Sequence, residues 1–310
     1  TFDFAALAEL GKTGLLSGNL AWFAFAGIFL GLAVKVPLFP FHTWLPDAYE
    51  TAPTGVSMVL TGVLSKMGVY GFIRLLLPLF PHEIQVLGPW LLGLAVCSIV
   101  FAPLAAWAQS DLKRMVAYLS INHLGYCMLG LFAVTTRSDI AAIDLQAAFS
   151  GVFMQIFNHG ITAAALFYFV GLLEERRGLR GLNDFGGLMQ RTPLLCGWMS
   201  VAMFSSLGLP GLNGFIGEFL IFKGSFAAAA SFTAIATIGL LVTAIVFLRA
   251  MQLLFSGPLA EGCKTLPDLL PGEGWVVVPV TLLMFALGIA PQFAFNIFSA
   301  TVIQMAQLFT

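Results

Sequence analysis

Apolar residues occur along the chain in eight long runs, separated by short polar or proline-rich connections. The runs cover residues 17–36, 55–77, 87–108, 113–135, 146–173, 193–222, 228–255 and 274–298. A helix needs about 20 mostly apolar residues to cross the hydrocarbon core of a bilayer, so each run is long enough for one crossing. The pattern therefore predicts an all-α integral membrane protein with eight transmembrane helices and no soluble domain.

The composition supports a membrane protein. Hydrophobic residues make up 59% of the 310 residues and charged residues only 9%, whereas soluble domains carry about 25% charged residues. The net charge of −1 excludes a basic surface for nucleic acid. The four cysteines lie far apart in the sequence, without the close pairs that zinc or iron–sulfur sites usually need. We therefore expect neither a metal site nor a nucleic-acid partner.

Two of the runs contain residues that interrupt a helix. In the first run, three prolines follow Lys35, so the helix is predicted to break over Lys35–Pro46. In the sixth run, Pro210 stands among four glycines, which predicts a second break over Gly208–Gly217. Lipid cannot satisfy the backbone groups that a break exposes. Corresponding breaks in two halves of a chain indicate an ion path in transporters, although packing kinks give the same pattern.

Five ionisable residues lie inside the apolar runs: Lys35, Lys66, His123, His159 and Glu218. A charge at the centre of a bilayer costs at least about 2.5–3.5 kcal/mol on insertion scales, so such residues are rare and mark ion or substrate paths. A single membrane histidine is more typical of an interhelical hydrogen bond. Five ionisable groups in one chain instead favour a path along which protons pass, because burial and neighbouring charges control their protonation.

Four stretches of the sequence resemble one known family. They are KVPLFPFHTWLPDAYETAPTGVSMVLTGVLSKMGVYGFIR at 35–74, AQSDLKRMVAYLSINHLGY at 108–126, FNHGITAAALFYFVGLLEERRG at 157–178 and LGLPGLNGFIGEFLIFKGSF at 207–226. The family is that of the antiporter-like subunits of respiratory complex I, which is shared with multisubunit cation/proton antiporters and membrane-bound hydrogenases. The resemblance covers essentially the whole chain.

The resemblance implies a multi-helix bundle of inverted five-helix repeats with two discontinuous transmembrane helices. Residues 1–77 would form the C-terminal end of the first repeat, with two helices, the first of them broken. Residues 78–255 would form the second five-helix repeat, which contains the broken sixth span. Residues 256–310 would hold a last transmembrane helix, so the chain would correspond to the C-terminal eight helices of the family.

The resemblance also implies a role for each buried ionisable residue. Lys35 matches a lysine that pairs, in the family, with a glutamate on an earlier helix and forms a protonation switch. Lys66 matches the central lysine that links two half-channels. His123 and His159 match the polar central axis, and Glu218 matches the terminal group of the output half-channel. A proton would then pass from Lys35 and Lys66 through the histidines to Glu218.

Four further residues match the family at the two breaks. They are His42, Trp44 and Asp47 in the first break and Pro210 in the second. We expect them to stabilise the loops of the broken helices rather than to carry protons. The histidine and glutamate at 82–83 stand between two runs and are expected to be solvated.

Glutamate rather than lysine at position 218 favours the subunit M branch of the family, also called chain 4. The resemblance then implies a proton-translocating membrane subunit of NADH-quinone oxidoreductase. Its partners would be neighbouring antiporter-like subunits and the lipid bilayer, in a bacterial inner membrane or an organellar energy-transducing membrane. No cofactor is expected in this chain, because it has no dinucleotide-binding motif, P-loop or cysteine cluster. NADH, FMN, iron–sulfur clusters and quinone would belong to other subunits.

Three other functions remain open from the sequence. A subunit of a cation/proton antiporter or hydrogenase would use the same bundle to exchange sodium for protons. A structural membrane scaffold would use the buried charges as static pairs that hold subunits together. An independent solute transporter is disfavoured, because no stretch offers a large polar pocket.

Overall fold

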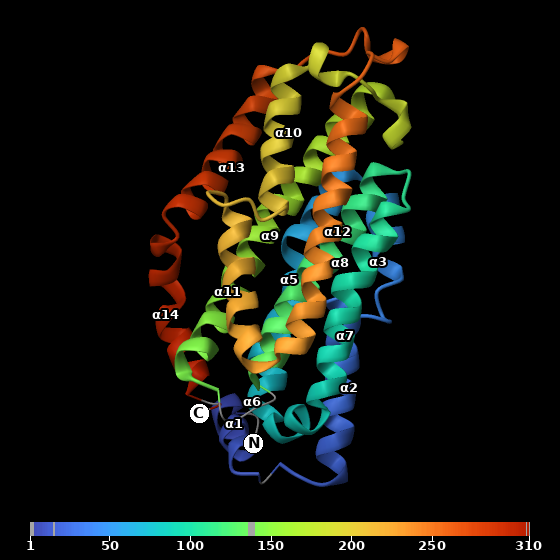
Figure 1. The fold of residues 1–310 in the computed structure, drawn as a ribbon. Coiled ribbons are helices and arrows are strands. Elements are labelled where there is room, and N and C mark those ends of the chain that lie inside the picture. Colours follow the sequence, from blue (N-terminus) through green and yellow to red (C-terminus); the bar gives the residue numbers. More distant parts are fainter. Residues whose placement is uncertain (1–2, 15, 136–139, 308, 310) are drawn as a thin grey trace.

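The computed structural model describes residues 3–14, 16–135, 140–307 and 309. These residues form an elongated bundle of long helices, in which α1 and the end of α14 lie at the same end (Figure 1). No strand is formed by the described residues, and one isolated bridge joins Asp111 and Gly181. The all-α bundle that the hydrophobic pattern predicts is confirmed.

In the first half of the chain, the described residues form seven α-helices and two π-helical segments. They are α1 (Phe4–Lys12), α2 (Asn19–Lys35), α3 (Trp44–Thr51), α4 (Thr54–Val59), the π-helical η1 (Leu60–Leu64), α5 (Ser65–Gly71), the π-helical η2 (Phe72–Leu76), α6 (Leu77–Leu79) and α7 (Pro81–Trp107). The elements from α4 to α6 follow one another without a gap, so they form one continuous helical stretch over Thr54–Leu79.

The part of the second half that the structure describes contains seven more α-helices and three short 3₁₀ turns. They are α8 (Leu112–Thr135), α9 (Ala142–Arg177), η3 (Leu182–Asp184), η4 (Leu188–Gln190), α10 (Pro193–Ser206), α11 (Asn213–Ala228), α12 (Ala230–Phe255), η5 (Glu261–Cys263), α13 (Pro271–Ile289) and α14 (Gln292–Ala306). Among the described residues, six helical stretches are long and apolar enough to cross a membrane. The shorter α2 and α10 are each the first part of a broken helix.

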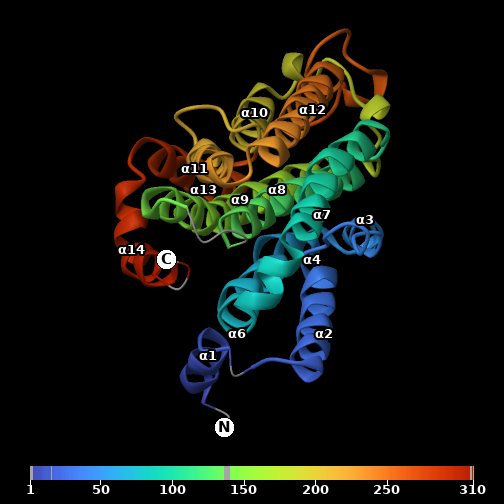
Figure 2. The ribbon, with the colours of Figure 1, turned by 60° about the horizontal axis from the view of Figure 1, so that its bottom comes forward.

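Helices α8 and α9 occupy the centre of the bundle. In an apolar stretch of 18 residues, 94% of α8 is buried, against 33% of α12. Helices α7, α9, α11 and α12 surround α8 (Figures 1 and 2). Helix α9 has 36 residues and is therefore about 54 Å long at 1.5 Å per residue. It passes the whole bundle and contacts both broken helices, so its inner face can position groups near each break.

The first break lies where the prolines predict it. Helix α2 ends at Lys35, residues 36–43 form a loop, and α3 begins at Trp44. Pro46 stands inside the first turn of α3, where a missing backbone N–H removes no helical hydrogen bond. The break is therefore shorter at its C-terminal end than the sequence indicated.

The second break is also shorter than predicted. Helix α10 ends at Ser206 and α11 begins at Asn213, so Gly214 and Gly217 lie inside α11. Their absent side chains serve packing, because a Cβ on Gly214 would overlap the carbonyl oxygen of Ser205. Gly208 inside the break has φ +70°, which a residue with a side chain adopts only at a cost.

Two expectations about the chain's ends and connections need correction. The run 274–298 predicted one helix, but α13 ends at Ile289 and α14 starts at Gln292. The reason is Pro291, which lacks the N–H that a continuous helix needs.

The connection at 82–83 was expected to be solvated, and this is wrong for the glutamate. Glu83 is only 1% exposed in the first turn of α7, where the helix dipole favours a carboxylate. His82 is exposed, as expected.

Candidate functional site

Lys66 lies in the interior of the bundle, and its side chain is nearly inaccessible, with 5% of the residue exposed. Its Nζ donates to the carbonyl oxygen of Thr61 and lies 3.4 Å from Oγ of Ser65. Both acceptors belong to the same helical stretch as the lysine. Within the described residues no carboxylate pairs with Lys66, so the ammonium depends on neutral oxygen atoms for its stabilisation.

Two π-helical segments flank the helix that carries Lys66. Segment η1 ends at Leu64 and η2 begins at Phe72, with only α5 between them. A π-helical turn holds an extra residue in the helix, which leaves carbonyl oxygens without the usual i−4 partner and often occurs at functional sites. The carbonyl of Thr61 in η1 is the one that accepts from the lysine. The local backbone thus supplies the ligand that the buried charge needs.

Helix α9 approaches this lysine through two glycines. A Cβ placed on Gly160 would lie 2.8 Å from the carbonyl oxygen of Gly62 and 3.9 Å from Cε of Lys66. The two backbones are therefore in direct contact beside the lysine. His159, the residue before Gly160, is 5% exposed, and the contact brings its ring to the same level of the bundle.

The two buried histidines and Glu218 form a compact cluster. The ring centroids of His123 and His159 are 4.9 Å apart. Nδ1 of His123 lies 3.2 Å from Oε1 of Glu218, and its Nε2 lies 3.0 Å from Oγ of Ser206 at the end of α10. The structure therefore brings together three of the five predicted ionisable residues at the second break, with Lys66 adjacent through Gly160.

The cluster encloses a small cavity. It is lined by His123, His159 and Glu218, together with polar groups of α9 and α10, and its volume is about 10 Å³. A cavity of roughly this size is about what one water molecule needs. A proton can then move between the lining groups either directly or through a single water.

A second polar network holds the ends of the broken helix α10/α11 and was missed by the sequence reasoning. Nδ2 of Asn158 donates to the carbonyl of Asn213 at 2.6 Å, and Nδ2 of Asn213 reaches back to the carbonyl of Asn158 at 3.3 Å. Ser205 donates to Oδ1 of Asn213, and its Oγ lies 3.0 Å from Oγ1 of Thr162. These bonds join the end of α10 to the start of α11 and tie both to α9.

Two stripes of polar residues in the sequence would have indicated these neighbours. On α9, Gln155, Asn158, His159 and Thr162 stand at spacings of three and four residues within an apolar run. Such spacings place side chains on one helix face. The stretch from α4 to α5 carries a similar stripe of hydroxyl groups, namely Thr54, Ser57, Thr61 and Ser65.

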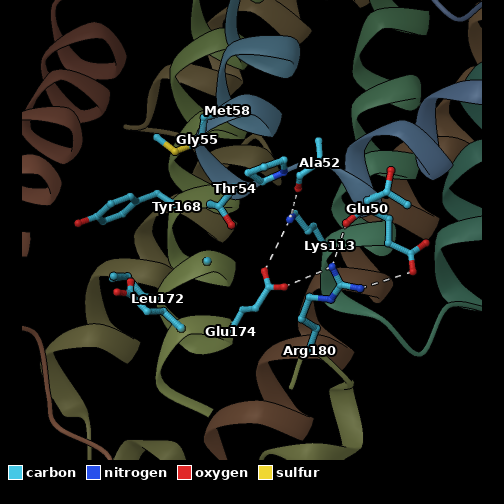
Figure 3. Close-up of a pocket in the computed structure, with 14 residues that line it drawn as sticks. Glu50, Ala52, Thr54, Gly55, Met58, Lys113, Tyr168, Leu172, Glu174 and Arg180 are labelled. Carbon is cyan, nitrogen blue, oxygen red and sulfur yellow. Dashed lines mark hydrogen bonds and ion pairs between the residues drawn. The ribbon is translucent and has the colours of Figure 1, made fainter. Parts of the chain in front are cut away.

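A larger, charged pocket lies at the end of the bundle where α8 begins and α9 ends (Figure 3). Its volume is about 570 Å³, and its wall includes Glu50, Lys113, Glu174 and Arg180. Nζ of Lys113 donates to the carbonyl of Ala52 at 2.7 Å and lies 3.6 Å from Glu174. Arg180 reaches both Glu174 and Glu50 (Figure 3).

The deep side of this charged pocket meets the hydroxyl stripe. Thr54, Gly55 and Met58 line the pocket, and the next turns carry the buried Thr61 and Ser65 beside Lys66. Oγ1 of Thr61 lies 3.3 Å from Oγ of Ser120 on α8. Polar groups therefore connect the pocket at the bundle's end with the buried lysine.

Lys35 is less closely associated with the cluster than the other four residues. It is the last residue of α2 and is half-buried. Its Cγ lies 3.1 Å from where a Cβ on Gly68 would stand, two residues beyond Lys66. Among the described residues it has no hydrogen-bonding or ion-pair partner through its side chain. The structure thus places Lys35 beside the helix of Lys66, in contact with its backbone face.

The residues predicted to support the first break contact its loop or its neighbours. Nε1 of Trp44 donates to the carbonyl of Val34 at 3.0 Å. The buried ring of His42 stacks on Phe39 with centroids 5.5 Å apart. Asp47 pairs with Arg114 at 2.6 Å, which ties α3 to α8. The bond from Trp44 occupies a carbonyl near the end of α2, the His42 ring packs within the loop, and the Asp47 pair holds α3 against α8.

Pro210 stands at the exposed side of the second break, within the loop between α10 and α11. The backbone N–H of Leu212, two residues later, donates to the carbonyl of Leu209 at 3.1 Å. Since proline has no N–H to satisfy, it suits this turn.

In the part of the chain that the structure describes, no group of three His, Cys, Asp or Glu side chains has a metal-binding arrangement.

Comparison with known families identifies the chain's relatives. The sequence profile of the family described as "NADH:quinone oxidoreductase/Mrp antiporter, TM" matches residues 1–245. The chain belongs to this family. The match includes both breaks and all five ionisable residues predicted from the sequence, so the sites described above lie within the part that defines the family.

Two curated relatives from different bacteria bear the same name. NADH-quinone oxidoreductase subunit M of Rickettsia prowazekii is 37% identical over 304 residues, which are 97% of this chain and 59% of that protein. Subunit M of Pseudomonas aeruginosa is 36% identical over 301 residues, or 97% of this chain and 56% of that protein. The chain therefore spans a little more than half the length of these relatives.

Solved structures share the fold. A chain of respiratory complex I from Thermus thermophilus with bound NADH superposes with a TM-score of 0.85 and 27% identity, covering 99% of this chain and 66% of that chain. A chain of the Mrp complex from Dietzia gives a TM-score of 0.79 at 20% identity over 97% of this chain and 64% of that chain. The second similarity concerns the fold alone. The chain is a multi-pass membrane protein of this architecture.

Proposed function

We propose that this chain is part of subunit M of a bacterial NADH-quinone oxidoreductase and translocates protons across the inner membrane. The observation that carries the proposal is the buried sequence of groups from Lys66 through His159 and His123 to Glu218. Each of these groups can hold and release a proton, and each is at most 5% exposed. Residues that serve only for packing do not need ionisable side chains, because burying an ionisable group in the membrane costs free energy.

The route begins at the charged pocket in Figure 3. A proton enters there and follows the hydroxyl groups of Thr54, Ser57 and Thr61 to Lys66. From the lysine it passes to His159 at the glycine contact, then to His123 at a ring separation of 4.9 Å. Glu218 receives it at 3.2 Å and releases it on the far side of the membrane.

Charge coupling between neighbouring groups drives the transfer. Two unit charges 4 Å apart interact by about 4 kcal/mol at an effective dielectric constant near 20. Two adjacent protonated groups therefore repel each other strongly, and one proton pushes the next along the row. Lys35 beside the helix of Lys66 acts as the switch, because a change in the pairing of its charge alters how readily Lys66 holds a proton.

The remaining parts of the reaction belong to other chains. NADH oxidation and quinone reduction, with FMN and iron–sulfur clusters, take place in other subunits of the complex, and this chain contributes the translocase step. Its partners are the neighbouring antiporter-like membrane subunits. Residues 78–255, with the break between α10 and α11, act as the second of two inverted repeats, while residues 1–77 complete the first.

The test compares proton pumping and electron transfer in membrane vesicles that contain the parent complex. The variants are Lys66→Ala and Glu218→Gln, with Lys223→Ala as the matched control on α11, because Lys223 is exposed. We expect both site variants to assemble, as judged on a native gel, and to lose most NADH-driven proton uptake together with turnover. Normal pumping by an assembled site variant would disprove the route, and failure of assembly in both would indicate a structural scaffold.

A further inference from the structure

Nδ1 of His123 faces two side chains of opposite hydrogen-bonding character. Nε2 of Gln155 lies 3.4 Å away, and an amide nitrogen only donates. Oε1 of Glu218 lies 3.2 Å away, and an ionised carboxylate only accepts. Protonation of Nδ1 therefore decides which of the two it can bond.

We propose that Gln155 is a positioning residue for proton transfer at His123, a role that rests on the proton path proposed above. When Nδ1 is bare, the amide of Gln155 donates to it and stabilises the neutral ring. When Nδ1 carries a proton, that hydrogen bond is lost and the N–H turns to Glu218. Gln155 thus favours the state in which His123 has already given up its proton.

The other ring nitrogen is held apart from this exchange. Nε2 of His123 lies 3.0 Å from Oγ of Ser206, and a hydroxyl can accept from an N–H at that position. In the proposed cycle the Nε2–H stays on Ser206 throughout. In the neutral state this tautomer leaves Nδ1 as the bare nitrogen, which is the form that the amide of Gln155 requires.

Packing keeps the Gln155 amide in place. Gln155 is 2% exposed, and a Cβ on Gly217 of α11 would lie 2.7 Å from its Oε1. Oε1 makes no hydrogen bond with a described residue, whereas Nε2 faces the histidine. The side chain therefore fills a space that only glycine at 217 leaves open, with its donor directed at Nδ1.

The transfer conserves protons at each step. A proton leaves the ring of His159 and binds Nδ1 of His123, while the bond from the Gln155 amide to Nδ1 breaks. The new Nδ1–H then breaks as Oε1 of Glu218 takes the proton, which leaves a neutral imidazole and a protonated carboxyl. The amide of Gln155 donates to the bare Nδ1 again and opposes return of the proton.

The charged and titratable groups around His123 come from its own helix and from three others. They are Glu218 on α11, His159 on α9, Tyr126 on its own helix at a ring distance of 5.4 Å, and Lys66 on α5 beyond His159. Gln155 itself carries no charge. Gln155→Met therefore changes the hydrogen bonding of Nδ1 without adding or removing a titratable group.

The experiment measures the pH profile of NADH-driven proton uptake in vesicles with the intact complex. Gln155→Met keeps the shape of the side chain but removes the donor. As the pH is lowered, we expect turnover of this variant to fall at a higher pH than turnover of the parent. The pH at which half of the turnover is lost should rise by about half to one unit, which corresponds to the loss of one neutral hydrogen bond. Gln155→Glu, which accepts from the protonated ring, moves the midpoint further in the same direction.

The matched control is Asn122→Leu, which removes another buried amide. Its Nδ2 donates to the carbonyl of Ile99, and its Oδ1 accepts from Thr243, so it faces away from Gln155. We expect slower turnover from this variant with the parental midpoint. An unshifted midpoint in both Gln155 variants, or an equal shift in Asn122→Leu, would overturn the role of Gln155. Normal pumping by Lys66→Ala and Glu218→Gln would instead overturn the path itself.

Discussion

The backbones of Gly62 and Gly160 touch at the point where the helix of Lys66 meets α9. A Cβ on Gly160 would lie 2.8 Å from the carbonyl oxygen of Gly62, closer than side chains normally come to backbone. No flexible side chain is available to yield at this contact. The separation between Lys66 and His159 is therefore set by two residues that carry no chemistry of their own.

Substitution of Gly160 by alanine should interrupt proton transfer while leaving every ionisable group in place. The added methyl forces the two helices apart, and overpacking of this kind costs about 1–3 kcal/mol of stability. We expect reduced proton uptake in an assembled complex. Gly93→Ala on α7 is the control, because a Cβ there meets nothing within 4 Å. Equal pumping by the two variants would show that the glycine contact does not limit transfer.

Two glycines in the second break allow the effects of backbone strain and of a side-chain clash to be tested separately. Gly208 and Gly211 both have positive φ, +70° and +95°, so alanine at either position costs about 1–2 kcal/mol. Only at Gly208 would the Cβ also strike Oε2 of Glu218, at 2.5 Å. We expect similar losses of thermal stability from Gly208→Ala and Gly211→Ala, but a much larger loss of pumping from Gly208→Ala. If pumping falls equally in both, strain in the loop rather than displacement of the carboxylate is responsible.

The sequence predicted the membrane helices and their two interruptions for simple physical reasons. Runs of apolar residues have few other stable environments than a bilayer, and prolines after Lys35 and at Pro210 prevent a regular helix. Buried ionisable residues such as Lys66 stand out because they are so costly in an apolar run. The break at Pro291 carried the same kind of signal, and reading the run across it as one helix was wrong.

The arrangement of the site depends on contacts that local patterns do not contain. Asn158 and Asn213 are 55 residues apart and bond each other's backbone, which requires the packing of α9 on α11. The π-helical turn that places the carbonyl of Thr61 at Lys66 depends on backbone hydrogen bonds rather than on a distinctive motif. Gln155 was overlooked because a single glutamine in an apolar run has no charge, although its spacing to His159 placed it on the same face.

Lys113 is expected to contribute more to the stability of the charged pocket than its partner Glu174. The lysine side chain is 3% exposed and the glutamate side chain 34%. Removing the lysine in Lys113→Met breaks its hydrogen bond to the carbonyl of Ala52, and a hydrogen bond to a charged group is worth about 1.5–3 kcal/mol. Glu174→Gln weakens two partly exposed ion pairs, with Lys113 and with Arg180, each worth about 0–1 kcal/mol.

Thermal unfolding of the two single variants and the double variant measures this difference. We expect Lys113→Met to lower the melting temperature clearly and Glu174→Gln to lower it slightly. The effect of Glu174→Gln should shrink when Lys113 is already replaced, since one of the two ion pairs of Glu174 is then gone. A larger effect from the glutamate than from the lysine would mean that the ion pairs of Glu174 on α9, and not the bond from Lys113 to Ala52, hold this end of α8 in place.

Asp268 caps a helix to which it is not adjacent in sequence. Its two carboxylate oxygens accept from the backbone N–H groups of Leu194 and Leu195 at 3.0 and 2.9 Å, in the first turn of α10. Burial raises the pKa of this carboxyl, but the donors, including the N–H of Leu269, outweigh it and hold the pKa below its usual value of 3.8. The connection before α13 is thus fastened to the start of the broken helix.

A lowered pKa fixes the sign of the pH dependence. The stabilisation is fully present above the unfolded value of about 3.9 and disappears as the pH falls through the lower value of the folded protein. At neutral pH, Asp268→Asn keeps one acceptor oxygen but loses the negative charge at the start of α10, and should therefore cost about 0.3–1 kcal/mol. Toward about pH 3 and below, the difference between the variant and the parent should shrink as the parent's own carboxyl takes up a proton.

Thermal unfolding of the purified protein in detergent, from neutral pH down to this acidic range, checks both parts. Glu261→Gln is the control, because that carboxylate pairs only with Lys264 and its side chain is 89% exposed. It should leave the melting temperature unchanged at every pH. A constant difference between Asp268→Asn and the parent across the whole range would mean that the cap acts through its shape, since asparagine also caps helices, and not through its charge.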